Sequence, residues 1–263
     1  MNKLAGQQMA RYPSLQGRRV FVTGGGTGIG EAIVRAFVEQ GAVVAFVDIA
    51  QEASEKLCAA LADVNAPGRT APVFRYCDIT DIPALQRTMA KLAEQLGDFE
   101  VLVNNAANDQ RHDIDKVSLD YWNERIAINQ RPMFFTAQAV LPGMRKMGGG
   151  SIINFSSMSW HAKGAGYPVY ATTKAAVIGL TRSLARDLGP FGVRVNTVTP
   201  GWVMTQRQID LWVDEAAELE IKKAQCLPGK LMPDDIAAMV LFLGADDSRM
   251  CTAQDFVVDA GWT

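Results

Sequence analysis

Tyr170 and Lys174 lie four residues apart and are candidates for proton transfer. In a helix, this spacing places both side chains on one face. A free phenol, with a pKa of about 10, is a poor base at neutral pH, but a neighbouring ammonium group favours the phenolate. Ser157 stands thirteen residues before Tyr170, at the end of an apolar run. A Y-x-x-x-K pattern alone is more often a solvated helix face, so its meaning depends on its context.

A glycine-rich stretch, TGGGTGIG at 23–30, separates an apolar run from a segment with helical periodicity. Its glycines follow the pattern G-x-x-x-G-x-G at Gly24, Gly28 and Gly30 rather than G-x-G-x-x-G. A backbone without side chains can approach a pyrophosphate closely, and the helix that follows points its positive dipole end at the anion. The alternative is a tight turn with no ligand.

Asp48 ends the second apolar run, eighteen residues after Gly30. This is near the spacing at which an acid meets the adenosine ribose of a dinucleotide. The carboxylate accepts hydrogen bonds from ribose hydroxyls and repels a 2′-phosphate, and Thr27, not Arg or Lys, precedes Gly28. These features predict NAD rather than NADP as cofactor. The alternative for Asp48 is a carboxylate that only closes a strand-end turn.

Apolar runs that alternate with amphipathic stretches must position these residues. Continuous apolar strands between helices predict an α/β fold, a single-domain Rossmann-type doubly wound parallel sheet with helices on both faces. The predicted strands are 19–23, 43–48, 72–77, 100–104, 150–156, 193–199 and 255–259. The predicted helices are 29–40, 51–63, 81–96, 118–147, 168–188, 206–225 and 233–244.

The composition fits one domain over the whole chain of 263 residues. We expect residues 1–17 to form an N-terminal extension, 18–130 mainly to bind the cofactor, and 150–230 to carry the catalytic and substrate segments. Hydrophobic residues make up 48% of the chain, enough for a large core. The net charge of −2 and the scattered basic residues argue against nucleic acid and membrane surfaces as partners.

The termini, the cysteines and the histidines limit the cellular location and the metal chemistry that we expect. No apolar segment typical of a signal peptide or a membrane span is visible. The four cysteines are widely spaced, which is typical of reduced thiols, and we expect a cytoplasmic protein. The two histidines, His112 and His161, stand outside metal-ligand spacings, so no metal site is predicted.

Taken in order, these motifs resemble the short-chain dehydrogenase/reductase family over essentially the whole chain. The resemblance rests on 23–30, Asp78-Ile79, Asn104-Asn105-Ala106, Asn129, Ser157, Tyr170, Lys174 and Pro200-Gly201. It implies that Ser157 orients the substrate oxygen and that Tyr170 exchanges the proton. Lys174 would hold the nicotinamide ribose and lower the tyrosine pKa, and Asn129 would support a water relay to that lysine. Ala107 departs from the family, which usually has glycine there.

The cofactor contacts expected from the glycine loop, the acid and the resemblance form one set. They are Gly24, Gly26, Thr27, Gly28, Ile29, Gly30, Asp48, Asp78, Ile79, Asn105, Ala106, Tyr170, Lys174, Pro200, Gly201 and Val203. The resemblance places Asp78 and Ile79 near the adenine, and Val203 near the nicotinamide amide. The implied cofactor is NAD.

The substrate pocket should form after the fourth, fifth and sixth strands. These segments are polar with aromatic faces, which suits a polyhydroxylated ring better than an acyl chain, although loops are polar in any protein. Segments such as 108–113, 153–161 and 259–263 resemble the NAD-linked aldose dehydrogenases of the family, which act on D-xylose or similar pentoses and hexoses and make aldonolactones. Candidate substrate contacts are Asn108, Ser157, Trp160, His161, Tyr170 and Gln206. The roles of Arg207 and of the C-terminal tail stay open.

Three other functions share much of this pattern: an NAD(P)-dependent carbonyl reductase, a polyol or secondary-alcohol dehydrogenase, and a non-catalytic dinucleotide-binding regulator. The resemblance also implies a homo-oligomer, commonly a tetramer, built from the helices at 118–147 and 168–188. The apolar side chains there could equally belong to the core. They are Phe134, Phe135, Val177, Leu180 and Leu184.

Overall fold

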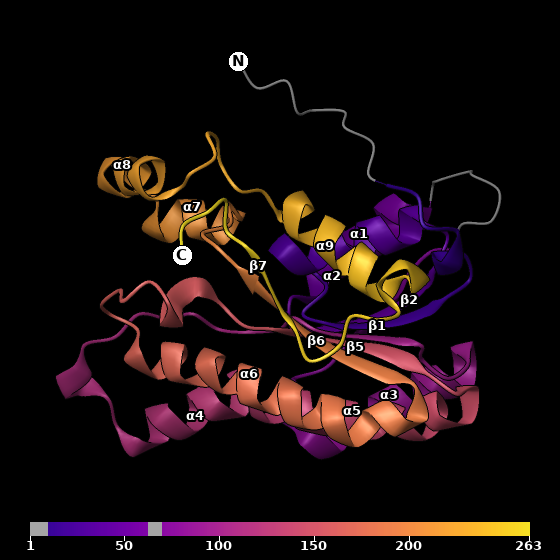
Figure 1. The fold of residues 1–263 in the computed structure, drawn as a ribbon. Helices are drawn as coiled ribbons and strands as arrows, with labels where there is room; N and C mark the ends of the chain where they lie inside the picture. Colours follow the sequence, from indigo (N-terminus) through magenta and orange to yellow (C-terminus); the bar gives the residue numbers. More distant parts are fainter. Residues whose placement is uncertain (1–9, 63–69) are drawn as a thin grey trace.

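The computed structural model describes residues 10–62 and 70–263. Its strands form one parallel sheet in the order β3-β2-β1-β4-β5-β6-β7 (Figure 1). The strands are β1 (Arg19–Thr23), β2 (Val43–Asp48), β3 (Val73–Tyr76), β4 (Val101–Asn104), β5 (Gly150–Phe155), β6 (Val193–Pro200) and β7 (Asp255–Val258). After β3 the chain crosses to β4 on the other side of β1, so the switch point at which such sheets bind ligands lies at the carboxyl ends of β1 and β4.

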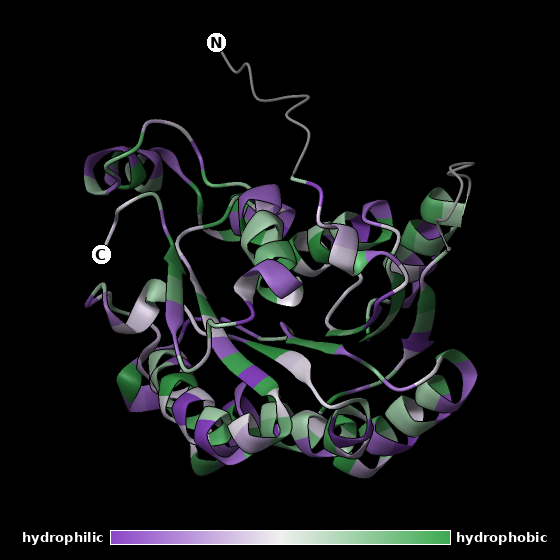
Figure 2. Ribbon diagram, turned by 45° about the vertical axis from the view of Figure 1, so that its right-hand side comes forward, coloured by the Kyte–Doolittle hydropathy of each residue, from purple (hydrophilic) through white to green (hydrophobic). Residues whose placement is uncertain are grey.

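Helices cover both faces of the sheet (Figure 1). One core cluster joins the sheet to α1 (Gly28–Glu39), α2 (Gln51–Ala62) and α9 (Pro233–Gly244). The other joins it to α3 (Ile82–Leu96), α5 (Arg131–Met147) and α6 (Pro168–Leu188). Most helices in Figure 2 alternate between purple and green, as expected when one side faces the sheet and the other faces water. The predicted doubly wound α/β fold is confirmed.

The prediction of one helix over 118–147 was wrong. The structure has α4 (Leu119–Asn129) and α5, separated at Gln130, whose φ of −130° and ψ of −54° are not helical. Pro132 explains the break, because its ring nitrogen cannot donate to the carbonyl of Ile128. The interruption places Asn129 at the end of α4.

The prediction of one helix over 206–225 was also wrong. Here α7 (Gln206–Trp212) and α8 (Glu215–Ala224) are separate, because Val213 has a φ of −97° and a ψ of 87°. The side chain of Asp214 then caps α8 by accepting a hydrogen bond from the N–H of Ala217 at 2.8 Å.

The other predicted elements are present, with ends that agree with the prediction or differ from it by one residue. Residue 63, the predicted end of the second helix, lies outside the described residues, as do residues 1–9 of the predicted N-terminal extension. The rest of that extension packs on the domain, since Leu15 is fully buried in the core. None of the helices in the described part of the chain combines the length and apolar composition that a membrane crossing requires.

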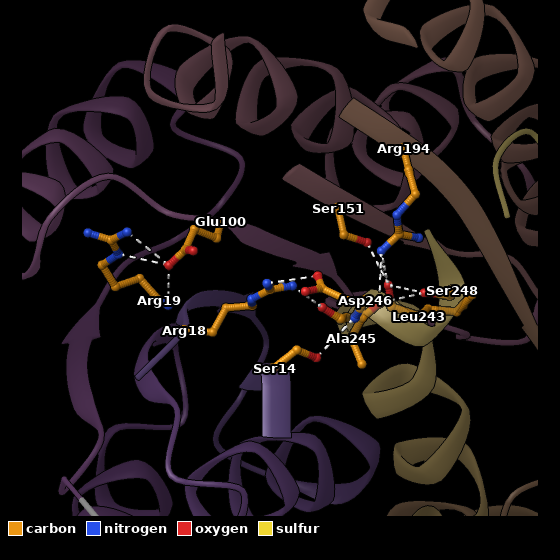
Figure 3. Close-up of polar contacts among 11 residues, drawn as sticks. Ser14, Arg18, Arg19, Glu100, Ser151, Arg194, Leu243, Ala245, Asp246 and Ser248 are labelled. Atoms are coloured by element: carbon orange, nitrogen blue, oxygen red, sulfur yellow. Dashed lines mark hydrogen bonds and ion pairs between the residues drawn. The ribbon is translucent and has the colours of Figure 1, made fainter. Parts of the chain in front are cut away.

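Side chains from β5, from β6 and from the residue before β1 hold the carboxyl end of α9 (Figure 3). The carbonyl of Leu243 accepts hydrogen bonds from Arg194 Nη2 at 2.7 Å and from Ser151 Oγ at 2.8 Å. Arg18 donates to the carbonyl of Gly244 at 3.0 Å and pairs with Asp246. These donors satisfy the last carbonyls of the helix, which have no partner within it. They fix the carboxyl end of α9 near the amino ends of the strands, whereas the candidate site lies at their carboxyl ends.

Candidate active site

The glycine loop folds against the segment that follows β4. A Cβ on Gly24 would lie 2.8 Å from Ala106 Cα, and one on Gly30 would collide with the carbonyl oxygen of Gly24. Asn105 Nδ2 donates to the carbonyl of Gly24 at 2.8 Å and to that of Thr23 at 3.2 Å. Glycine is therefore required here by the close approach of two backbones, and Asn105 holds the loop in place.

Asp48 ends β2 beside this loop, as its place in the sequence predicts. Its carboxylate accepts hydrogen bonds from the N–H groups of Gly26 and Ala50, each at 2.8 Å. A Cβ on Gly26 would lie 3.0 Å from the Oδ2 atom of Asp48. The acid is thus fixed next to the backbone that is predicted to approach the cofactor.

The start of α1 suits an anionic group. Thr27 precedes the helix in extended conformation and its side chain makes no capping hydrogen bond. The first amide groups of the helix, from Gly28 to Gly30, have no intrahelical acceptors and lie at the positive end of its dipole. Together with the glycine cradle and Asp48, they fit a nicotinamide dinucleotide with its pyrophosphate at the helix N-terminus and its ribose near the acid.

Lys174 is buried under the site, with only 1% of its surface exposed. Its Nζ donates to the carbonyl of Phe155, the last residue of β5, at 2.9 Å. Burial lowers the pKa of this ammonium to about 7, and the Asp109 carboxylate acts in the opposite direction. A buried lysine held at the end of a strand can carry or release a proton near neutral pH.

Tyr170 lies one helical turn away, with its ring centroid 5.7 Å from Lys174 Nζ. Burial is the main cause that raises the pKa of this phenol, and the Asp109 carboxylate raises it further. A hydrogen bond with Ser157 acts in the opposite direction. The three residues predicted to act together therefore meet at the carboxyl end of β5. In the structure the net shift of the tyrosine pKa is upward, whereas the resemblance implies lowering by Lys174.

Asn129 is fully buried and holds the loop after β4. Its Oδ1 accepts from the N–H of Asn108 at 2.8 Å, and its Nδ2 donates to the carbonyl of Asn108 at 3.1 Å. The end of α4 thereby fixes the backbone of the loop. The water relay implied for Asn129 stays a prediction.

Two of the predicted substrate contacts follow Ser157. Trp160 Nε1 donates to Ser156 Oγ at 3.1 Å, and Ser156 Oγ donates to the carbonyl of Lys174 at 2.8 Å. The His161 ring stacks on Trp160 with centroids 3.5 Å apart, and His161 is exposed. The tryptophan is thus tied to α6, the helix that carries Tyr170 and Lys174.

Gln206, another predicted substrate contact, begins α7 and is exposed. Its Nε2 donates to Asp210 on the same helix at 2.7 Å. The next residues of α7, Arg207 and Gln208, instead contact the Asp109 carboxylate across the site. The segment 108–113 is recognisably polar from the sequence, but these contacts of Asp109 are not predictable from it, because they depend on how the loop after β4 meets α7.

The remaining predicted cofactor residues lie at strand ends. Asp78 follows β3 and accepts from the N–H of Thr80 at 2.9 Å, with Ile79 between them half-buried. Pro200 ends β6, and Gly201 donates its N–H to the carbonyl of Val258 at 2.9 Å. Val203 is buried and pairs with Leu231. In residues 10–62 and 70–263, no group of three or more His, Cys, Asp or Glu residues is placed to hold a metal ion.

The fold and this site define the class of the protein. A seven-stranded parallel sheet, a glycine loop at its switch point and a Ser-Tyr-Lys set at the end of β5 occur together here. A family model described as Enoyl-(Acyl carrier protein) reductase matches residues 24–263. The chain belongs to the short-chain dehydrogenase/reductase family.

Within this family, the chain is similar to two curated sugar dehydrogenases. It is 48% identical over 253 residues to a D-xylose 1-dehydrogenase of Caulobacter vibrioides, covering 96% of this chain and 98% of that protein. It is 44% identical to a probable galactose dehydrogenase of Rhizobium meliloti, covering 96% and 97%. A solved 3-oxoacyl-[acyl-carrier protein] reductase of Brucella melitensis with bound NAD superimposes with a TM-score of 0.83 at 30% identity, covering 96% of this chain and 94% of that one.

Proposed function

We propose that this chain is an NAD-dependent aldose 1-dehydrogenase, which oxidises D-xylose or a similar pentose or hexose at the anomeric carbon to the aldonolactone. The observation that carries the proposal is the hydrogen-bonded Ser157–Tyr170 pair beside the Lys174 ammonium, below a loop of polar residues. The two sugar dehydrogenases, at 48% and 44% identity, support an aldose over an acyl or steroid substrate.

In the proposed reaction, Ser157 and Tyr170 hydrogen-bond the anomeric hydroxyl. Tyr170, as phenolate, accepts the hydroxyl proton while the hydride on the same carbon leaves, so the C–O bond becomes the lactone carbonyl. The bound nicotinamide supplies the positively charged two-electron acceptor for that hydride. The Lys174 ammonium favours the phenolate and opposes the effect of burial on the tyrosine pKa, and a bound nicotinamide cation would act in the same direction. Asn129 keeps the loop after β4 in position through Asn108.

Asp48 supports NAD as the cofactor. Its two oxygens already accept the Gly26 and Ala50 amides and keep further lone pairs for ribose hydroxyls. A 2′-phosphate would place two negative charges together at this point. The glycine loop 24–30 and the start of α1 would hold the pyrophosphate.

We also propose a cytoplasmic homo-oligomer, a tetramer or dimer. The four cysteines are unpaired, as expected in a reducing compartment. Of the side chains considered for the oligomer surface, Val177 is fully buried and belongs to the core, whereas Phe134 is 46% exposed. Leu119 and Trp122 on α4 are exposed as well, so both helices carry apolar side chains that a partner subunit would cover. Light scattering on the protein as it elutes from a size-exclusion column tests the oligomeric state.

The substrate test follows NADH absorbance with D-xylose, L-arabinose, D-galactose and D-glucose, and repeats each assay with NADP. We expect turnover of at least one aldose, preference for NAD, and a lactone as the first product. Preference for NADPH with an apolar ketone would identify a carbonyl reductase, and a ketose product would identify a polyol dehydrogenase. If none of these substrates is turned over, the result would favour the non-catalytic dinucleotide-binding regulator.

A further inference from the structure

Asp109 stands in the loop after β4 and faces α7 across the site. Its carboxylate accepts from Arg207 Nε at 3.2 Å and from Gln208 Nε2. The same carboxylate raises the pKa values of both Tyr170 and Lys174, so it lies beside the proposed reacting groups. The Asp109 carboxylate has no role in the reaction proposed above.

Asp109 is held in position both through the backbone of its own loop and by side chains of α7. Asn129 holds the backbone of the preceding residue, Asn108, by two hydrogen bonds. On α7, the amide of Gln208 is bonded at both ends, since its Oε1 accepts from Trp202 Nε1 at 3.0 Å. That bond fixes the amide orientation, so that the NH₂ group faces Asp109.

The loop and α7 have a second contact. The guanidinium of Arg111, two residues after Asp109, lies 4.3 Å from the centroid of the Trp212 ring. Two residues of the loop therefore reach the same short helix, one by charge and one by ring contact. The carboxylate is oriented by its surroundings and is not a freely rotating surface group.

The carboxylate also keeps hydrogen-bonding capacity. An ionised carboxylate offers about four acceptor sites, and the structure gives this one two donors within the described chain. Its Arg207 partner is 54% exposed and bonds through Nε alone, whereas a tightly held pair would bond through both prongs of the guanidinium. An exposed pair of this kind contributes little to stability.

A fixed negative charge beside a phenol that must ionise is unfavourable for catalysis unless substrate binding needs it. We propose that Asp109 binds the sugar: its carboxylate accepts hydrogen bonds from ring hydroxyls other than the anomeric one, and Gln208 and Arg207 orient it. This inference rests on the proposed function. The ligand class is a polyhydroxylated ring, because a carboxylate has no donor and needs hydroxyl hydrogens.

The test replaces Asp109 and removes sugar hydroxyls in parallel. The variants are Asp109→Asn, Arg207→Met and the control Asp113→Asn, a carboxylate of the same loop that pairs with the exposed Lys116 at 2.6 Å. Each is assayed with the best aldose and with its 2-, 3- and 4-deoxy analogues. Thermal unfolding of each variant checks the fold.

We expect D109N to raise KM for the aldose by about 10- to 100-fold with a smaller change in kcat. With the unchanged enzyme, kcat/KM for at least one deoxy analogue should be lower than for the parent sugar by a similar factor. With D109N, kcat/KM for that analogue should be little lower than for the parent sugar. D113N should behave as the unchanged enzyme, and R207M should lie between the two. In D109N the acidic limb of the kcat/KM profile should move to lower pH, because the Asp109 charge, which raises the pKa of the Tyr170 phenol, is lost while Lys174 and Tyr167 remain beside that phenol.

Several results would overturn the inference. If all three deoxy analogues keep the kcat/KM of the parent sugar, no ring hydroxyl is recognised, whatever the variants do. If R207M and D109N have equal effects that do not depend on which sugar hydroxyl is removed, Asp109 only holds α7. If the unchanged enzyme oxidises aldoses and D109N has the same KM, this inference alone is refuted. An unchanged enzyme with no aldose activity would refute the proposed function as well.

Discussion

The Nζ atom of Lys174 lies 5.7 Å from the centroid of the Tyr170 ring and donates to the carbonyl of Phe155 at 2.9 Å. The same burial raises the pKa of the phenol and lowers that of the ammonium to about 7, because each charged form loses water. Both side chains are therefore closer to neutral than they would be in water. The positive charge of a nicotinamide ring bound beside them would favour ionisation of the tyrosine.

Tyr170→Phe should lower kcat by about 10²- to 10⁴-fold, the usual contribution of a general base. The substitution removes one oxygen and leaves the glycine loop and Asp48 untouched, so the affinity for NADH should stay within a factor of about three. Steady-state assays and a fluorescence titration measure the two effects. Retention of most turnover would refute Tyr170 as the base.

Lys174→Met should change how stability depends on pH. The folded pKa of about 7 lies below that of an unfolded lysine, so at higher pH the unfolded chain binds a proton that the folded chain lacks. The free energy of unfolding of the unchanged protein should thus rise relative to K174M between about pH 7 and pH 10, by up to about 1.4 kcal/mol per pH unit.

Urea titrations across this range measure the difference, which should be flat below about pH 6. Lys56→Met is the matched control, because Lys56 is exposed and pairs with Glu52 on the surface. A difference between the unchanged protein and K174M that stays constant from pH 6 to pH 10 would show that burial does not lower the pKa of Lys174.

Asp48→Ala should shift cofactor preference by weakening NAD about 10- to 100-fold while NADP changes less, because the repulsion of the 2′-phosphate is lost together with the ribose contact. The ratio of kcat/KM values for NAD and NADP measures this. Glu52→Gln, an exposed acid of α2, is the control. Equal losses for both cofactors would mean that Asp48 acts only through the Gly26 and Ala50 amides.

Arg194→Met should destabilise the fold by about 2 to 3 kcal/mol without affecting the site directly. The guanidinium donates to the carbonyls of Leu243 and Ala245, and Met would leave these buried acceptors with fewer partners. Chemical unfolding measures the loss, and Arg249→Met on the exposed surface is the control. Equal stability of the two variants would contradict the role of Arg194 at the end of α9.

Local patterns predicted most of the fold because each pattern depends on neighbouring residues. Continuous apolar runs correspond to the buried parallel strands, and Gly41, with a φ of +80°, ends α1 as a C′ glycine. The helix breaks at Gln130 and Val213 were missed, although Pro132 is a local signal for the first. The second break has a weaker signal in Asp214, a good N-cap residue.

The sequence by itself determined the fold class, the family and the identity of the Ser-Tyr-Lys set, since motif order and helical spacing are properties of the chain. Only the tertiary structure decided which charges face one another. Asp109 meets Arg207 from 98 positions away, and the burial that moves the pKa values of Tyr170 and Lys174 exists only once the strands and helices pack. Desolvation and contacts between distant loops depend on three-dimensional packing, which residue types and spacing do not encode locally.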